Sequence, residues 1–144
     1  MPSPHRTREI ARQETGHYRV VATSANVTLT DDDGGTYFTV TQASAYDITL
    51  PAISASRAGW WADFTLVTAG SNDVDVVAAT ADADKIYILE NSDTATNNAS
   101  DPADKVTFDA SNAGIGDHLH IWHDGNNWYA RQSSVADAGA EHSG

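Results

Sequence analysis

HLHIWHDGNNWYARQ, residues 118–132, holds two short segments rich in aromatic and branched side chains on either side of an Asp-Gly turn. Aromatic and β-branched residues favour extended strands, and Asp-Gly between two such segments is a strong hairpin signal. The stretch therefore predicts an antiparallel pair of strands joined by Asp124–Asn127.

The same kind of short, alternating segment recurs along the chain, as in Val27-Thr28-Leu29-Thr30 and Asp73-Val74-Asp75-Val76. A period of two places alternate side chains on opposite faces of a strand. The predicted strands are His17–Thr23, Asn26–Thr30, Tyr37–Thr41, Asp47–Leu50, Trp61–Thr68, Asp73–Ala79, Lys85–Glu90, Lys105–Asp109, His118–His123 and Trp128–Gln132. Regular spacing without a long helical pattern predicts an all-β fold, an antiparallel β-sandwich or jelly roll.

The chain is 144 residues long, which is the length of one domain. We expect an extended N-terminal arm at residues 1–19, a β-sandwich at 20–132 and a flexible tail at 133–144. The polar stretch Asn91–Ala103 is a long loop between strands, and long loops in compact domains are usually functional or mobile. It is therefore a candidate contact with a receptor or a neighbouring subunit.

The net charge of −12 comes from a surface rich in Asp and poor in Lys, because 16 of the 20 acids are Asp and only two of the eight bases are Lys. Such a surface stays soluble where salt reduces the Debye length to about 3 Å. The composition is typical of a halophilic protein, although an ordinary acidic protein remains the alternative. It disfavours nucleic-acid binding, which depends on Lys and Arg. No segment approaches the roughly 20 apolar residues of a membrane span.

Basic residues are concentrated near the N-terminus. Up to Arg19 there are four Arg against two Glu, whereas the rest of the chain has four bases against 18 acids. This distribution suggests a tether that lies on an acidic neighbour. A short disordered leader is the alternative, since chain termini are often loose.

His118 and His120 are the residues that most resemble a catalytic or metal site. On a strand both imidazoles project to one face, and they would bind zinc or nickel if a carboxylate from another strand joined them. The alternative is a pair of solvent-facing or interface histidines. The sequence contains no Gly-x-Ser-x-Gly nucleophile elbow and no Gly-rich phosphate loop. We therefore expect no enzymatic activity, no cofactor and no resident metal.

The four tryptophans suggest an interface. Trp60 and Trp61 are adjacent, so they face opposite ways in a strand, and one of them should be exposed or buried in a neighbour. We expect Trp60 to be the interface residue, in an oligomer. Trp61 and Trp122 are expected in the core.

Several segments together resemble a β-rich module of tailed-virus structural proteins. They are Val27-Thr28-Leu29-Thr30, Thr36-Tyr37-Phe38-Thr39-Val40, Tyr46-Asp47-Ile48-Thr49-Leu50-Pro51, Trp61–Val67, Gly116–Ile121 and Asp124–Tyr129. The resemblance covers about Val20 to Arg131 and is one of turns and alternation, without catalytic residues. Such modules occur in capsid decoration (cement) proteins, head fibres and tail fibres.

The resemblance implies a trimer on the outer surface of a virion, bound to the major capsid protein and bridging capsomers, with no nucleic-acid or membrane partner. Arg6, Arg8 and Arg12 would pair with an acidic shell, and Tyr18 and Trp60 would be apolar anchors. A receptor- or glycan-binding module of a head or tail fibre is the alternative.

Overall fold

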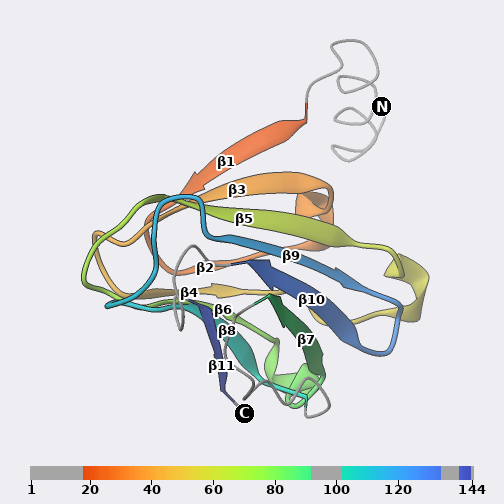
Figure 1. Ribbon diagram of the computed structural model, residues 1–144. Helices are drawn as coiled ribbons and strands as arrows, with labels where there is room; N and C mark the ends of the chain where they lie inside the picture. Colours follow the sequence, from red (N-terminus) through yellow and green to blue (C-terminus); the bar gives the residue numbers. More distant parts are fainter. Residues whose placement is uncertain (1–17, 92–101, 134–139, 144) are drawn as a thin grey trace.

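The computed structural model describes residues 18–91, 102–133 and 140–143. The described residues form strands and three short 3-10 helices, and the strands belong to two mixed sheets (Figure 1). The all-β fold class predicted from the sequence is confirmed. Within the described part of the chain, no helix has the length and apolar character needed to cross a membrane.

The strands fall where the alternating pattern predicted them, with small shifts at their ends. They are β1 Arg19–Thr23, β2 Val27–Thr28, β3 Thr36–Thr41, β4 Tyr46–Thr49, β5 Trp61–Thr68, β6 Val74–Val77, β7 Ile86–Asn91, β8 Lys105–Phe108, β9 His118–His123, β10 Trp128–Ser133 and β11 Ala140–Ser143. The predicted connection after Pro51 contains a 3-10 turn at Ala55–Arg57. Strand β11 lies in the segment expected to be a flexible tail, where it pairs with β8.

Consecutive strands alternate between the two sheets from β1 to β9. The six-stranded sheet has the order β1-β3-β5-β9-β10-β7, and the five-stranded sheet has the order β11-β8-β6-β4-β2. Strands two apart in sequence therefore become neighbours and run parallel, as β1, β3 and β5 do in one sheet and β2, β4 and β6 in the other. The first six strands thus wind around the core in successive turns (Figure 1).

This winding corrects the expectation of antiparallel sheets. Among the described pairings, five are parallel and four are antiparallel. The β9–β10 hairpin predicted around Asp124–Asn127 is antiparallel, as expected. Gly125 has φ of +97° in this turn, a conformation that glycine adopts without steric cost. The sequence pattern identified the strands and the β9–β10 hairpin, but not the other pairings.

One hydrophobic core contains side chains from both sheets. Every second residue is buried on β3, β4, β6, β8, β9 and β10, as Phe38 and Val40 are on β3 and Leu119 and Ile121 are on β9. The rings of Phe38 and Phe64 stack at 5.1 Å. Because this core takes the inward side chains, the remaining side chains of the six-stranded sheet form a separate outer face.

Candidate binding face

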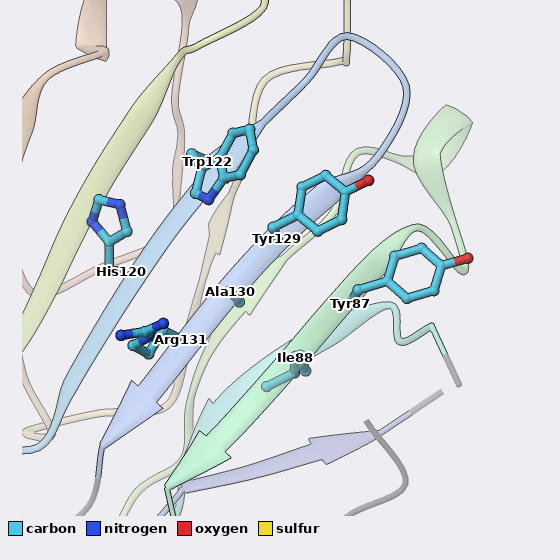
Figure 2. Close-up of a pocket in the computed structure, with 7 residues that line it drawn as sticks. All are labelled: Tyr87, Ile88, His120, Trp122, Tyr129, Ala130 and Arg131. Atoms are coloured by element: carbon cyan, nitrogen blue, oxygen red, sulfur yellow. The ribbon is translucent and has the colours of Figure 1, made fainter. Parts of the chain in front are cut away.

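An aromatic row crosses the outer face of the six-stranded sheet. The four residues are Trp61 on β5, Trp122 on β9, Tyr129 on β10 and Tyr87 on β7, and each is the register partner of the next. Neighbouring strands lie about 4.8 Å apart, so register partners place their side chains next to one another. Figure 2 shows Trp122, Tyr129 and Tyr87 side by side on this face.

The rings at the β9–β10–β7 end of the row are only moderately inclined to one another. Trp122 and Tyr129 have ring centroids 4.9 Å apart and planes inclined by 32°. Tyr129 and Tyr87 have centroids 6.1 Å apart and planes inclined by 25°. Trp122 is 41% exposed, which is high for so large an apolar side chain. The three rings form a shallow aromatic platform, which we define as Trp122, Tyr129 and Tyr87.

A second aromatic group lies toward the β1 edge of the same sheet. Tyr18, the first described residue, packs edge-to-face against Tyr37 at 5.4 Å and against Trp61 at 6.2 Å. Tyr37 also packs edge-to-face against Trp61, at 5.6 Å. Aromatic side chains therefore extend across the sheet from its β1 edge to β7.

A polar row runs beside the aromatic row, one step along the strands. Asp63 on β5 is the register partner of His120 on β9, which in turn faces Arg131 on β10. Asp63 Oδ1 lies 2.6 Å from His120 Nδ1 and 3.5 Å from His118 Nε2. Only 9% of the Asp63 side chain is exposed. This nearly buried carboxylate orients both imidazoles.

The position of Asp63 has a consequence for its neighbour Tyr37. Burial raises the pKa of the Tyr37 hydroxyl, and the negative charge of Asp63 raises it further. The hydroxyl therefore stays protonated and neutral at physiological pH. The ring of His120 also lies against that of Trp61, with centroids 5.8 Å apart. The polar and aromatic rows are thus in direct contact.

The arrangement of His118 and His120 matches the sequence prediction in part. Both project to the same face of β9, and the carboxylate that the sequence could not identify is Asp63. In the described residues, no set of three or more His, Asp and Glu side chains is arranged to hold a metal ion. Asp63 Oδ1 instead lies within hydrogen-bonding distance of His120 Nδ1. Among the described hydroxyl groups of Ser and Thr, none is hydrogen-bonded to either imidazole.

The tryptophans lie the other way round from the prediction. Trp60, expected at an interface, is 6% exposed and belongs to the chain's own core. Its Nε1 donates to the carbonyl of Thr30 at 3.2 Å, and its ring packs edge-to-face on Trp128. Trp61 and Trp122, expected in the core, lie on the outer face.

Strand parity could have revealed this error. On β5, Trp61 and Asp63 project to one face of the strand and the buried Ala62 to the other. On β9, Trp122 projects to the same face as His118 and His120. A tryptophan on the same side of a strand as its polar residues faces outward. This signal was present in the sequence and outweighs the general tendency of tryptophan to be buried.

Of the residues expected to contact a capsid, Tyr18 and Trp60 are described, and Trp60 is buried in the chain's own core. The Tyr18 side chain is 56% exposed at the edge of the six-stranded sheet. Arg6, Arg8 and Arg12 lie outside the described residues, as does most of the Asn91–Ala103 loop. Ala103 is described and is fully buried, with backbone hydrogen bonds to Ile86 in both directions.

Comparison of the chain with protein-family models, with curated proteins and with solved structures finds no match.

Proposed function

We propose that the chain is a non-catalytic structural protein of a tailed virus, which decorates and stabilises the outer surface of the capsid as a trimer. The observation that supports this proposal best is the β1 edge of the six-stranded sheet. Tyr18 is 56% exposed and Val20 is 64% exposed at this edge. They directly follow the basic N-terminal segment that carries Arg6, Arg8 and Arg12.

An open sheet edge with exposed apolar side chains is a typical contact site. Strand β1 ends the six-stranded sheet, so its outer edge has no partner strand among the described residues. An unpaired edge offers backbone donors and acceptors to an added strand, and apolar side chains beside it supply buried area. We propose that the capsid shell pairs with this edge and that the N-terminal arm lies along the shell.

Charge favours an acidic partner for the arm and an apolar contact for the body. Salt screens exposed ion pairs strongly, with a Debye length of about 3 Å at 1 M. If the source is halophilic, Tyr18 and Val20 would therefore contribute more to the affinity than the arginines.

The proposal includes a more specific fold, a β-sandwich with an extended N-terminal arm. Binding only the assembled shell would stabilise it by mass action.

The test is the number of copies of the chain in purified particles of the virus that encodes it, measured by quantitative mass spectrometry against the major capsid protein. A decoration role predicts about one copy per capsid subunit. A few copies per particle would reject decoration in favour of a tail or fibre position. Absence from particles would reject the virion proposal.

The proposed contact is tested with shells stripped of this protein. A chain lacking residues 1–16, and a Tyr18→Ser variant, should lose binding to the shell while keeping the circular dichroism spectrum of the intact chain. Trp122→Ala is the matched control, because Trp122 lies on β9, away from the β1 edge. Full binding by both the truncated chain and Tyr18→Ser would show that the shell contacts another surface.

A further inference from the structure

Among the residues that the structure describes, Arg131 has no charged partner, unlike the other Lys and Arg residues there. The remaining Lys and Arg side chains of the described chain each pair with an aspartate, as Arg19 does with Asp33, Arg57 with Asp31, Lys85 with Asp82 and Lys105 with Asp75. No ion pair or hydrogen bond of the Arg131 side chain occurs among the described residues. This is unexpected in a chain with 20 acidic residues.

The surroundings of Arg131 contain few carboxylates. Of the residues that face outward on β3, β5, β9 and β10, the only acid is Asp63, and it already contacts two imidazoles. The outer face of the other sheet instead carries Asp47 and Asp75, which are register partners. On these four strands the aromatic face thus carries one outward acid, which is paired with imidazoles, and in the adjoining turn Asp124 accepts a hydrogen bond from the Tyr129 hydroxyl at 3.1 Å.

Arg131 lies next to the aromatic platform. It shares strand β10 with Tyr129, and with His120, Trp122 and Tyr87 it lines a shallow depression. In Figure 2 the rings of Tyr129 and Tyr87 are seen broadside, with Arg131 and His120 along one side of the platform. Ring faces and a free guanidinium thus lie on one accessible surface.

We propose that this surface binds a glycan that carries carboxylate groups, such as one built from uronic or sialic acids. The C–H groups of a pyranose ring would lie on the ring faces of Trp122, Tyr129 and Tyr87. The carboxylate would accept paired hydrogen bonds from the Arg131 guanidinium, whose planar fork matches carboxylate geometry. His120, held by Asp63, would contact a sugar hydroxyl.

The shape of the platform favours a sugar over a peptide. A peptide anchor usually inserts an aromatic or arginine side chain into a pocket, whereas these three rings are inclined to their neighbours by only 32° and 25° and form a shallow, open surface. A pyranose ring covers such a surface without a deep pocket. The platform lies on β9, β10 and β7, at the other end of the sheet order from β1. Glycan binding therefore does not depend on the proposed capsid contact.

The experiment uses the purified full chain without virus particles. Binding of trigalacturonate and of sialyllactose is titrated by calorimetry and by tryptophan fluorescence. The fully methyl-esterified trigalacturonate is the matched ligand, because it keeps the sugar rings and removes the charge. We expect binding of at least one carboxylated probe, with affinity falling about tenfold or more in Arg131→Gln, since hydrogen bonds to charged groups are the strong ones.

Trp122→Ala should weaken the same binding about tenfold through loss of ring contact. Arg57→Gln and Tyr18→Ala are matched controls, which remove an exposed arginine and an exposed tyrosine outside the platform, and they should bind as the wild type does. Circular dichroism and the denaturation midpoint confirm that each variant is folded.

Any of the following results would overturn the proposal. One is that neither carboxylated probe binds the folded wild-type chain. Another is that binding survives both Arg131→Gln and Trp122→Ala, or that the methyl ester binds as tightly as the acid. The last is a concentration-dependent dimer of the chain that Trp122→Ala abolishes, which would assign this face to a second copy of the protein.

Discussion

The contrast between Trp60 and Trp122 provides a direct test of the fold and of the binding face. Trp60 is 6% exposed, while Trp122 is 41% exposed. The Trp60 ring packs on Trp128 with centroids 5.4 Å apart, and its Nε1 donates to Thr30. Replacing each tryptophan by alanine therefore removes a core side chain in one variant and a surface side chain in the other.

The two substitutions should differ severalfold in their effect on the free energy of unfolding. Truncation of a buried tryptophan costs about 3–5 kcal/mol, because apolar contacts are lost and a cavity remains. Substitution at an exposed position that lacks such contacts changes stability by about 0.5 kcal/mol or less. Trp122 still contacts Tyr129, so its loss is expected at the upper end of that range.

The assay is urea denaturation followed by far-ultraviolet circular dichroism, in the same salt for all variants. With a slope of about 1–3 kcal/mol per molar urea, Trp60→Ala should lower the midpoint by 1 M or more, and Trp122→Ala should shift it only slightly. Equal shifts, or a larger shift for Trp122→Ala, would refute the assignment of the two side chains. A midpoint for Trp60→Ala that changes with protein concentration would instead restore Trp60 to an oligomer interface.

Two further predictions concern residues away from the platform, the buried His123 and the closely packed Gly70. Burial lowers the pKa of His123, whose Nδ1 accepts a hydrogen bond from the Gly125 amide. Because the unfolded chain then binds a proton more readily than the folded chain, the contribution of His123 to stability should be complete above about pH 6.5 and fall as the pH drops below it. Denaturation midpoints measured between pH 8 and pH 5.5 should show a weaker pH dependence in His123→Gln than in the wild type. Gly70→Ala should lower the free energy of unfolding by about 1–3 kcal/mol, because a Cβ at Gly70 would lie 2.3 Å from the backbone oxygen of Gln42. Ser71→Ala, at the neighbouring exposed residue, should be nearly neutral. Equal denaturation midpoints for the two variants would contradict the close approach of Gly70 to the Gln42 backbone.

The alternation of side chains along the chain was enough to identify ten strands and the all-β class. Residues 61–68 and 118–123 were assigned with the same bounds that the structure has. Local pattern is reliable there because each strand must bury one face, and a period of two records which residues do so. The same alternation indicates that Trp61 and Trp122 face outward, although the general tendency of tryptophan to be buried suggested the opposite.

Apart from the β9–β10 hairpin, the pairing between strands was decided only by the tertiary structure. The parallel arrangement of β1, β3 and β5 arises because the chain alternates between two sheets, a property of the whole path rather than of any segment. The segment that contains β11 has only a weak strand pattern in its sequence, and its strand forms by pairing with the edge of β8.

The binding face shows the same division between local and long-range information. The sequence by itself determined that His118 and His120 lie on one face of a strand and that the protein is strongly acidic. Only the register between β5, β9 and β10 brought Asp63 to His120 and placed Arg131 beside them, 57 and 11 residues apart in sequence from His120 respectively. Hydrogen bonds across a sheet join residues regardless of their separation along the chain, which is why a site assembled from several strands cannot be read from any one of them.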